Sequence, residues 1–115
     1  MSFERACALA EVPLDEALGV TIGRYDIAVA RHEGPGMTEV FAIQDLCSDA
    51  AVPLSEGEVD DCTVECWLHG SRFDLRTGKP TGLPATEPVA TFPVDVRDGD
   101  VYVDITTTLN GVTPS

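Results

Sequence analysis

Two short segments contain the residues of this chain that are best suited to hold a metal centre. The first is Cys47-Ser48-Asp49, and the second is Cys66-Trp67-Leu68-His69, with 16 residues between Asp49 and Cys66. Because each segment supplies one thiolate and a second donor, two such loops can hold one centre with four ligands. Iron binds thiolate, imidazole and carboxylate ligands, and the same four donors could also form a tetrahedral zinc site. The spacing alone therefore leaves an iron–sulfur cluster and a zinc ion both open.

The size and charge of the chain limit the functions that it can have. Its 115 residues, 43% of them hydrophobic, are enough for one compact domain and too few for two useful cores. The formal net charge is −13, from 20 acidic and 7 basic residues, which repels phosphate backbones and anionic lipids. We therefore expect a single domain over residues 1–115 that binds neither nucleic acid nor membranes. The charge fits either a partner with a basic docking face or simple solubility.

The N-terminal residues and the cysteines favour a cytoplasmic protein. The chain begins without a basic segment followed by an apolar stretch, and no window approaches the roughly 18 apolar residues of a membrane span. The reducing cytosol favours metal ligands or buried thiols over a disulfide framework. We expect no disulfide among the four cysteines, which are Cys7, Cys47, Cys62 and Cys66.

The pattern of the whole chain predicts an all-β fold. Alternating or β-branched runs are bounded by Gly, Pro or Asp, and no window of helical length shows an apolar stripe with a 3.6-residue period. The predicted strands are Phe3–Ala10, Leu18–Ile22, Tyr25–Arg31, Val40–Ile43, Glu58–Asp60, Thr63–Glu65, Arg72–Asp74, Ala90–Val96 and Asp100–Ile105.

Turn residues predict how neighbouring strands are joined. Asp98-Gly99 favours a tight primed turn, and the valines at positions 94, 96, 101 and 103 should then face one core. Gly34-Pro35-Gly36 and the segment 76–79 also have the composition of hairpin tips. Residues 110–115 are expected to form a loosely ordered tail.

The alternation stops in three places, at residues 44–57, 66–71 and 82–85. Irregular backbone needs side chains, water or a ligand to satisfy its polar groups. Because the two ligand motifs fall in the first two of these segments, we expect the loops to form the site and the strands to hold them in place.

Beyond the ligands, residues 41–103 resemble a Rieske-type ferredoxin, in particular the small ferredoxin components of non-haem iron oxygenase systems. The matching segments are Phe41-Ala-Ile-Gln-Asp-Leu-Cys47, Pro53-Leu-Ser-Glu-Gly-Glu58, Val64-Glu-Cys-Trp-Leu-His-Gly-Ser-Arg-Phe-Asp-Leu-Arg-Thr-Gly78 and Leu83-Pro-Ala85. The resemblance implies the Rieske fold, in which antiparallel sheets carry a cluster-binding part, here roughly residues 44–85. It also favours a [2Fe–2S] cluster over zinc.

The resemblance assigns roles to individual residues. Cys47 and Cys66 match the thiolates on the inner iron, and His69 matches an imidazole on the outer iron near the surface. Asp49 stands where the family has its other histidine. The predicted ligands are therefore Cys47, Asp49, Cys66 and His69. Gly70 and Ser71 match positions beside the second ligand loop, and Leu83-Pro84 matches the proline-containing loop that covers the cluster.

Departures from high-potential relatives predict a low reduction potential. Val52 and Leu68 occupy the positions of two cysteines that form a disulfide in those relatives, and Phe73 replaces a tyrosine that donates a hydrogen bond. Fewer hydrogen bonds stabilise the reduced state less. Asp49 adds a negative charge that disfavours an extra electron. We predict a potential below the middle of the Rieske range, which is about −150 to +300 mV.

Several residues keep more than one interpretation. Asp49 can bind the outer iron, or water or Cys62 can take its place as the ligand. A third alternative is that the protein holds no cluster. Cys7 and Cys62 are otherwise expected to pack as small buried hydrophobes, and His32 to be solvated. Trp67 can shield the cluster, contact a partner or pack in the core. The acidic residues around position 58 suit either a docking face or a solvated edge.

The resemblance implies an electron-transfer protein that catalyses no bond chemistry itself. We expect a monomeric carrier that takes one electron from a flavin-dependent reductase and passes it to a terminal oxygenase or a related iron enzyme. An iron–sulfur assembly or redox-sensing domain with a labile cluster is the first alternative, because carboxylate exchanges more readily than imidazole. A scaffold subunit that has lost the cluster is the second. No serine–histidine–carboxylate or phosphate-loop pattern supports an enzyme.

Overall fold

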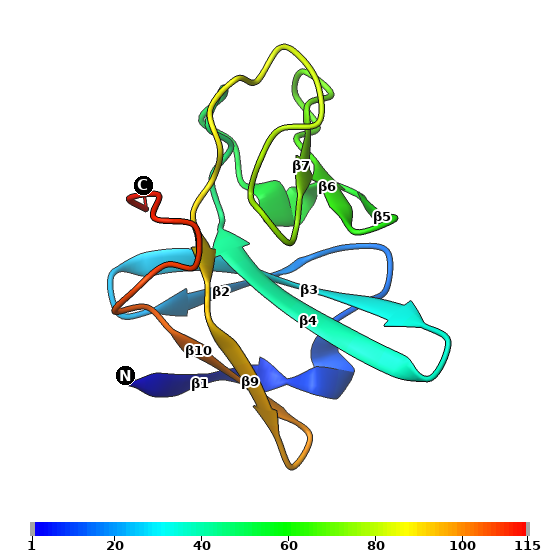
Figure 1. Cartoon of the computed structure of the whole chain (residues 1–115), viewed down its shortest axis with the longest axis vertical. Helices are drawn as coiled ribbons and strands as arrows, with labels where there is room; N and C mark the ends of the chain where they lie inside the picture. Colours follow the sequence, from blue (N-terminus) through cyan, green and yellow to red (C-terminus); the bar gives the residue numbers. More distant parts are fainter. Residues whose placement is uncertain (1, 115) are drawn as a thin grey trace.

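Three antiparallel sheets make up the protein (Figure 1). The structure is a computed structural model and describes residues 2–114. Its strands are β1 (Phe3–Ala8), β2 (Leu18–Ile22), β3 (Tyr25–Gly34), β4 (Met37–Gln44), β5 (Val59–Asp60), β6 (Thr63–Glu65), β7 (Arg72–Asp74), β8 (Thr91–Phe92), β9 (Val94–Arg97) and β10 (Asp100–Asp104). Two single 3-10 turns, η1 (Leu9–Glu11) and η2 (Leu54–Glu56), are the only helical segments of residues 2–114. The all-β prediction is confirmed.

The four-stranded sheet β2-β3-β4-β8 lies between the two three-stranded sheets. The sheet β1-β10-β9 packs on one face and closes the lower core, which contains Val101 and Val103. The small sheet β5-β6-β7 lies over the other face and closes the upper core, which contains Val64, Phe73 and the two ligand cysteines. Figure 1 shows this small sheet and the long loops together at the upper end of the molecule.

Strand β3 shows why the central sheet is covered on both faces. Side chains alternate between the two faces of a strand, and residues 27–30 are all apolar and all buried. Ile27 and Val29 pack in the lower core, whereas Ala28 and Ala30 pack in the upper core. An unbroken apolar run therefore belongs here to a strand with no solvated face.

The hairpin between β9 and β10 has the predicted turn. Asp98 and Gly99 both have positive φ, 50° and 79°, as a primed two-residue turn requires. The register pairs Val101 with Val96 and Val103 with Val94, so the four valines share a face. The expectation that all four face the core is wrong for Val96. It lies two register pairs closer to the hairpin tip than Val94 and remains 42% exposed, whereas its partner Val101 is fully buried.

The predicted strand 90–96 is two strands, because Pro93 interrupts it. Thr91–Phe92 pairs with β4 in the central sheet, whereas Val94–Arg97 pairs with β10 in the next sheet. Proline has no N–H to donate to a ladder, so the chain changes sheets at this residue. Its carbonyl still accepts a hydrogen bond from the Asp104 N–H (3.1 Å).

Both ends of the chain differ from the prediction. Strand β1 stops at Ala8, whose N–H binds the Glu11 carboxylate (2.8 Å) at the start of η1. The C-terminal segment is held rather than loose: Asn110 Nδ2 donates to the Val89 carbonyl (2.7 Å), and Val112 packs against the lower core. Ser115, the last residue of the predicted tail, lies outside the described residues. No helix within residues 2–114 has the length and apolar character to cross a membrane.

Asp104, which is buried, makes the stability of the fold depend on pH. Hydrogen bonds from the Thr106 hydroxyl and N–H lower the pKa of its carboxyl group. A carboxyl group with a lowered pKa in the folded state contributes stability above its unfolded pKa, about 3.9, and loses it as the pH falls through the folded value. At pH 7 we expect Asp104→Asn to unfold at a lower urea concentration than the unmodified protein. At pH 3 the two urea midpoints should lie closer together. A constant difference would contradict this.

Candidate metal centre

Three loops at the upper end of the molecule form the candidate site (Figure 1). The first ligand loop, residues 45–53, follows β4, and the second ligand loop, residues 66–71, joins β6 to β7. The third loop, residues 81–88, comes before β8. These are the irregular segments of the sequence, so the predicted location of the loops is confirmed.

Cys47 and Cys66 form a buried pair. They are 4% and 0% exposed and lie in the upper core with Leu54 and Phe73. Burial raises the pKa of the Cys66 thiol, and contact with the Cys47 side chain raises it further. A buried thiolate without a counter-charge is unfavourable, whereas bound iron supplies that charge. The pair is therefore suited to a metal that takes the place of the thiol protons.

Asp49 and His69 form a second pair nearer the surface. The His69 Nδ1 atom lies 3.1 Å from Asp49 Oδ2, and the side chains are 51% and 29% exposed. The two donors come from different loops, 20 residues apart, and could reach one metal ion together. The predicted ligands are thus brought together two by two.

This arrangement in pairs fits a two-iron cluster better than one zinc ion. A tetrahedral zinc site needs four donors around one point. Within residues 2–114, no three His, Cys, Asp or Glu side chains converge closely enough to hold one ion. A [2Fe–2S] cluster instead takes two ligands on each iron. A buried thiol pair and a more exposed Asp–His pair match the inner and outer irons of such a cluster.

Backbone N–H groups are directed at both ligand sulfurs. The Asp49 N–H lies 3.4 Å from Cys47 Sγ, and the backbone N–H groups of Leu68 and His69 oppose the rise in the pKa of the Cys66 thiol. Such donors stabilise negative charge on sulfur and favour the thiolate form. The loops therefore provide part of the electrostatic environment that a cluster needs.

Two polar side chains at the end of β4 fix the first ligand loop. Gln44, which is buried, accepts the Ala90 N–H (2.9 Å) and donates to the Leu46 carbonyl (3.0 Å). The Asp45 carboxylate accepts the N–H and the hydroxyl of Ser55, both at 2.6 Å. Sequence reasoning missed these anchors. Their only signal was the change from apolar to polar residues at the end of the strand.

The second ligand loop is closed on itself and tied to the third loop. The Cys66 N–H donates to the Ser71 carbonyl (2.7 Å), and the Gly70 N–H donates to the Cys66 carbonyl (2.9 Å). The Ala85 N–H donates to the Ser71 hydroxyl (3.1 Å), so the proline-containing loop rests on the ligand loop. The sequence placed Ser71 beside the site but did not indicate this bond.

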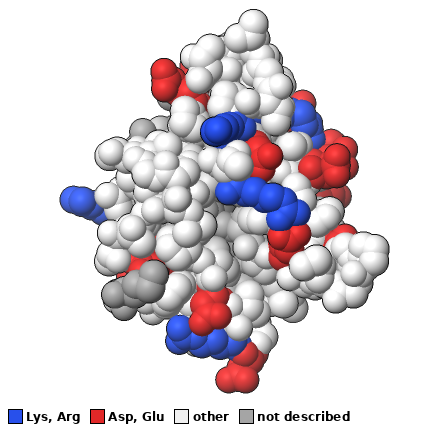
Figure 2. Space-filling model, in the orientation of Figure 1, with Lys and Arg blue, Asp and Glu red and all other residues white. Residues whose placement is uncertain are grey.

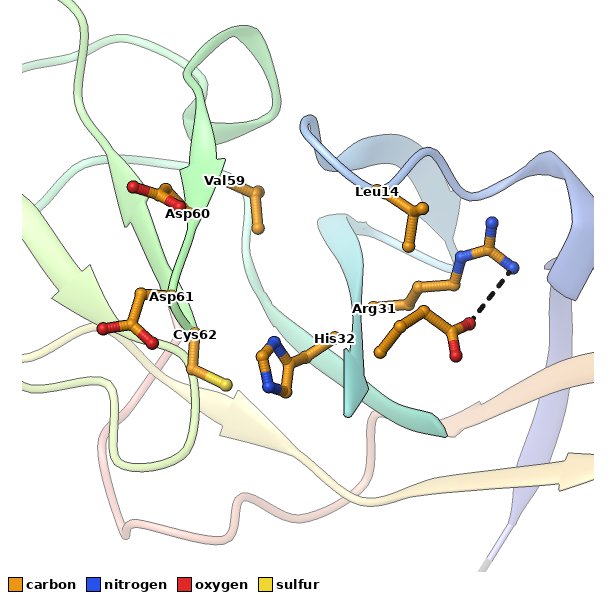
Figure 3. Close-up of a pocket in the computed structure, with 8 residues that line it drawn as sticks. Leu14, Arg31, His32, Val59, Asp60, Asp61 and Cys62 are labelled. Carbon is orange, nitrogen blue, oxygen red and sulfur yellow. Dashed lines mark ion pairs between the residues drawn. The ribbon is translucent and has the colours of Figure 1, made fainter. Parts of the chain in front are cut away.

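Cys62 and His32 lie together in a different place, which separates them from the four ligands. Both line a pocket of about 500 Å³, in which the His32 ring points towards Cys62 (Figure 3). Cys62 is in the turn before β6, and Cys66 follows that strand, roughly 13 Å away at the rise of an extended chain. Arg76 Nη2 lies 3.5 Å from the Cys62 sulfur. Cys62 is half-buried, and Cys7 is buried in the lower core as expected.

Trp67 and Leu68 face outwards between the two ligands of the second loop. They are 49% and 46% exposed, which excludes the core-packing interpretation of Trp67. Leu83, in the third loop, is 82% exposed. The upper end of the molecule therefore presents apolar side chains around the exposed His69.

Most of the basic side chains on the surface are paired with carboxylates. Several arginines are paired with carboxylates, among them Arg76 with Glu39 and Arg72 with Glu65 (3.5 Å). Figure 2 shows basic side chains next to acidic ones on the visible face, and an apex without charged residues. Because most positive charge is neutralised locally, the remaining surface is acidic and favours a partner with basic residues.

Comparisons with known proteins agree with this geometry. The model of the Rieske [2Fe-2S] domain family matches residues 2–93. The 3-phenylpropionate/cinnamic acid dioxygenase ferredoxin subunit of Shigella flexneri serotype 5b (strain 8401) is 45% identical over 101 residues, 87% of this chain and 91% of the relative. The Sphingomonas yanoikuyae B1 ferredoxin has a TM-score of 0.81 and 33% identity, covering 90% of this chain and 98% of its own.

A further structure contains a partner. It is a complex of reduced oxygenase and oxidised ferredoxin in carbazole 1,9a-dioxygenase. The matching chain has a TM-score of 0.77 and 32% identity, over 88% of this chain and all of its own length.

Proposed function

The chain belongs to the Rieske [2Fe-2S] domain family, and we propose that it is the ferredoxin of an oxygenase system, taking single electrons from a flavin-dependent reductase and passing them to a terminal oxygenase. It is an electron carrier and not itself a catalyst of bond chemistry. The observation that carries the proposal is the presence of two donor pairs in these loops, buried Cys47 with Cys66 and more exposed Asp49 with His69. Its similarity to an oxygenase-bound ferredoxin supports the choice of acceptor.

The proposed ligand set is Cys47 and Cys66 for the inner iron, with Asp49 and His69 for the outer iron. When bound, a [2Fe–2S] cluster takes up and releases one electron. The chain's own contribution is to exclude water from the thiolates and to direct N–H groups at their sulfurs. The contact between Asp49 and His69 supports their assignment to one iron, because both donors already occupy the same small region.

We propose that partners meet the apolar upper end, where His69 is exposed. Trp67, Leu68 and Leu83 supply apolar contact area, and the surrounding carboxylates steer basic partners. A small interface suits a carrier that must leave each partner quickly. We further propose that residues 1–115 act as one domain and that the protein is a monomer. The two cores on either side of one sheet support the single domain.

Cluster content tests the proposed function directly. Protein purified without oxygen should contain two irons and two acid-labile sulfides per chain and should accept one electron. It should then pass electrons from a flavin-dependent reductase to a terminal oxygenase over repeated cycles without losing iron. Iron loss during cycling would favour the assembly or sensing alternative, and a colourless protein without sulfide would favour the scaffold.

A matched pair of leucines tests the docking end. Leu83 and Leu109 are both highly exposed, but only Leu83 lies in the third loop beside the site. Losing the burial of one leucine at an interface costs about 1–2 kcal/mol, so Leu83→Ser should raise the KM for the ferredoxin in oxygenase turnover roughly tenfold. Leu109→Ser should leave it unchanged, and neither substitution should move the midpoint potential. Equal KM values for the two variants would contradict docking at this end.

A further inference from the structure

Trp67, the only tryptophan of the chain, has one specific polar contact. Its indole Nε1–H donates to Glu56 Oε1 at 3.1 Å, although half of the side chain is exposed. An exposed aromatic ring in a loop normally samples several rotamers. A hydrogen bond to an ionised acceptor selects the rotamer that reaches it. Glu56 therefore determines how the ring lies beside the ligand loop.

Glu56 can do this because its own backbone is firmly held. It is the last residue of η2, whose first residue, Leu54, is completely buried. The middle residue, Ser55, binds the Asp45 carboxylate through both its N–H and its hydroxyl. The N–H of Gly57 then closes the turn on the Leu54 carbonyl (3.0 Å). The acceptor of the indole bond thus stands on the segment that follows the first ligand loop.

The contact consequently joins the two ligand loops outside the metal ligands themselves. Trp67 lies between Cys66 and His69 in the second loop, whereas Glu56 belongs to the segment after the first loop, 11 residues earlier. We infer that Glu56 is a positioning residue for electron transfer, which fixes the Trp67 ring so that the oxygenase meets a preformed apolar end. The inference rests on the proposed function, because it concerns the surface that a partner would meet.

The expected change in KM follows from the free energy needed to immobilise the Trp67 ring when the interface forms. Immobilising a side chain when an interface forms costs enough free energy to change affinity roughly two- to tenfold. Glu56→Ala should therefore raise the KM for the ferredoxin in oxygenase turnover about threefold or more. Glu56→Gln keeps an amide oxygen that can accept the indole N–H and should behave close to the unmodified protein. Both variants lose the same charge, so they should share one midpoint potential, and the difference between them isolates the hydrogen bond.

Two further variants complete the test. Glu58→Ala removes an exposed carboxylate of the same acidic segment that does not bind the indole, and it should not reproduce the effect of Glu56→Ala. Trp67→Phe removes the donor, so adding Glu56→Ala to it should cause no additional rise in KM beyond the loss of charge seen in Glu56→Gln. The ultraviolet resonance Raman bands of the single indole should report loss of the hydrogen bond in Glu56→Ala and its retention in Glu56→Gln.

The outcomes separate this inference from the proposed function. A KM for Glu56→Gln as high as for Glu56→Ala, or unchanged indole bands in Glu56→Ala, would overturn the positioning role while electron transfer continues. If the unmodified protein passes no electrons to an oxygenase, the proposed function fails, and the positioning role at this interface fails with it. The Raman bands would then still show whether Glu56 holds the ring.

Discussion

Asp49→His is expected to raise the midpoint potential by roughly 125–350 mV. All-cysteine plant-type clusters lie near about −400 mV, whereas clusters with two cysteines and two histidines lie between about −150 and +300 mV. If the difference is shared equally between the two changed ligands, one neutral imidazole in place of a charged ligand accounts for half of it. The physical reason is charge: a carboxylate makes the oxidised site more negative and opposes the addition of an electron.

Redox titration followed by EPR measures this change, and a second carboxylate supplies the control. Glu87 is an exposed residue of the third loop. The Ser48 hydroxyl donates to its backbone carbonyl (2.6 Å) and not to its carboxylate. Glu87→Gln therefore removes one charge near the site without changing the ligands. Because a solvated charge is screened, it should move the potential far less than Asp49→His. Identical EPR spectra and potentials for Asp49→His and the unmodified protein would show that Asp49 is not a ligand.

The geometry also weighs the alternatives for the outer iron. Cys62 and His69 lie on opposite sides of β6 in the sequence, so the Cys62 thiol would have to span that strand to share an iron with His69. The Cys62 sulfur also contacts Arg76 Nη2. A solvent ligand would leave Asp49 beside the iron as an unligated negative charge. The hydrogen-bonding distance between Asp49 and His69 favours direct ligation, since the two side chains already meet. The Asp49→His titration separates these cases, because a carboxylate outside the ligand set would give a much smaller shift.

The fold was predictable wherever local pattern determines it. Strands β2, β6 and β7 match their predicted bounds, and turn-forming residues mark at least one end of each: Gly23 after β2, Asp61 before β6 and Gly70 before β7. The Asp98-Gly99 turn was predictable because few residue pairs adopt positive φ at two successive positions. The break at Pro93 was missed although proline signals it, whereas the exposure of Val96 has no local signal because it depends on how the sheets pack.

The sequence led to a proposed ligand set for the candidate site but gave no indication of the residues that support its loops. Cys47 and Cys66 stand out because the ability to bind a metal depends directly on residue type and spacing, which the sequence shows. Gln44 and Ser71 act through hydrogen bonds to Ala90 and Ala85, which lie far along the chain. The local sequence gives no indication of these partners. The Glu56 contact with the tryptophan is of the same kind. Sequence reasoning proposed the donors, and the structure was needed to find the residues that hold their loops.

Gly57→Ala is expected to cost roughly 3 kcal/mol or more of folding free energy. A Cβ at this position would lie 1.7 Å from the Glu65 carbonyl oxygen and 2.8 Å from its carbon. Both atoms belong to the backbone, so no side-chain rotation can relieve the clash. The backbone angles of Gly57, φ −95° and ψ 169°, are allowed for any residue. The cost is therefore steric, and it falls where the segment after the first ligand loop meets the residue that precedes Cys66.

Thermal unfolding and iron content measure this effect, with Gly82→Ala as the matched control. A Cβ at Gly82 would meet no atom within 4 Å, so that variant should unfold like the unmodified protein. For a domain of this size each kcal/mol lowers Tm by about 3–6 °C, so Gly57→Ala should unfold roughly 10 °C or more lower. It should also lose iron faster, because relief of the clash must move β6 away from the first ligand loop. A Gly57→Ala protein with the Tm of Gly82→Ala would show that these segments do not pack as closely as the structure has them.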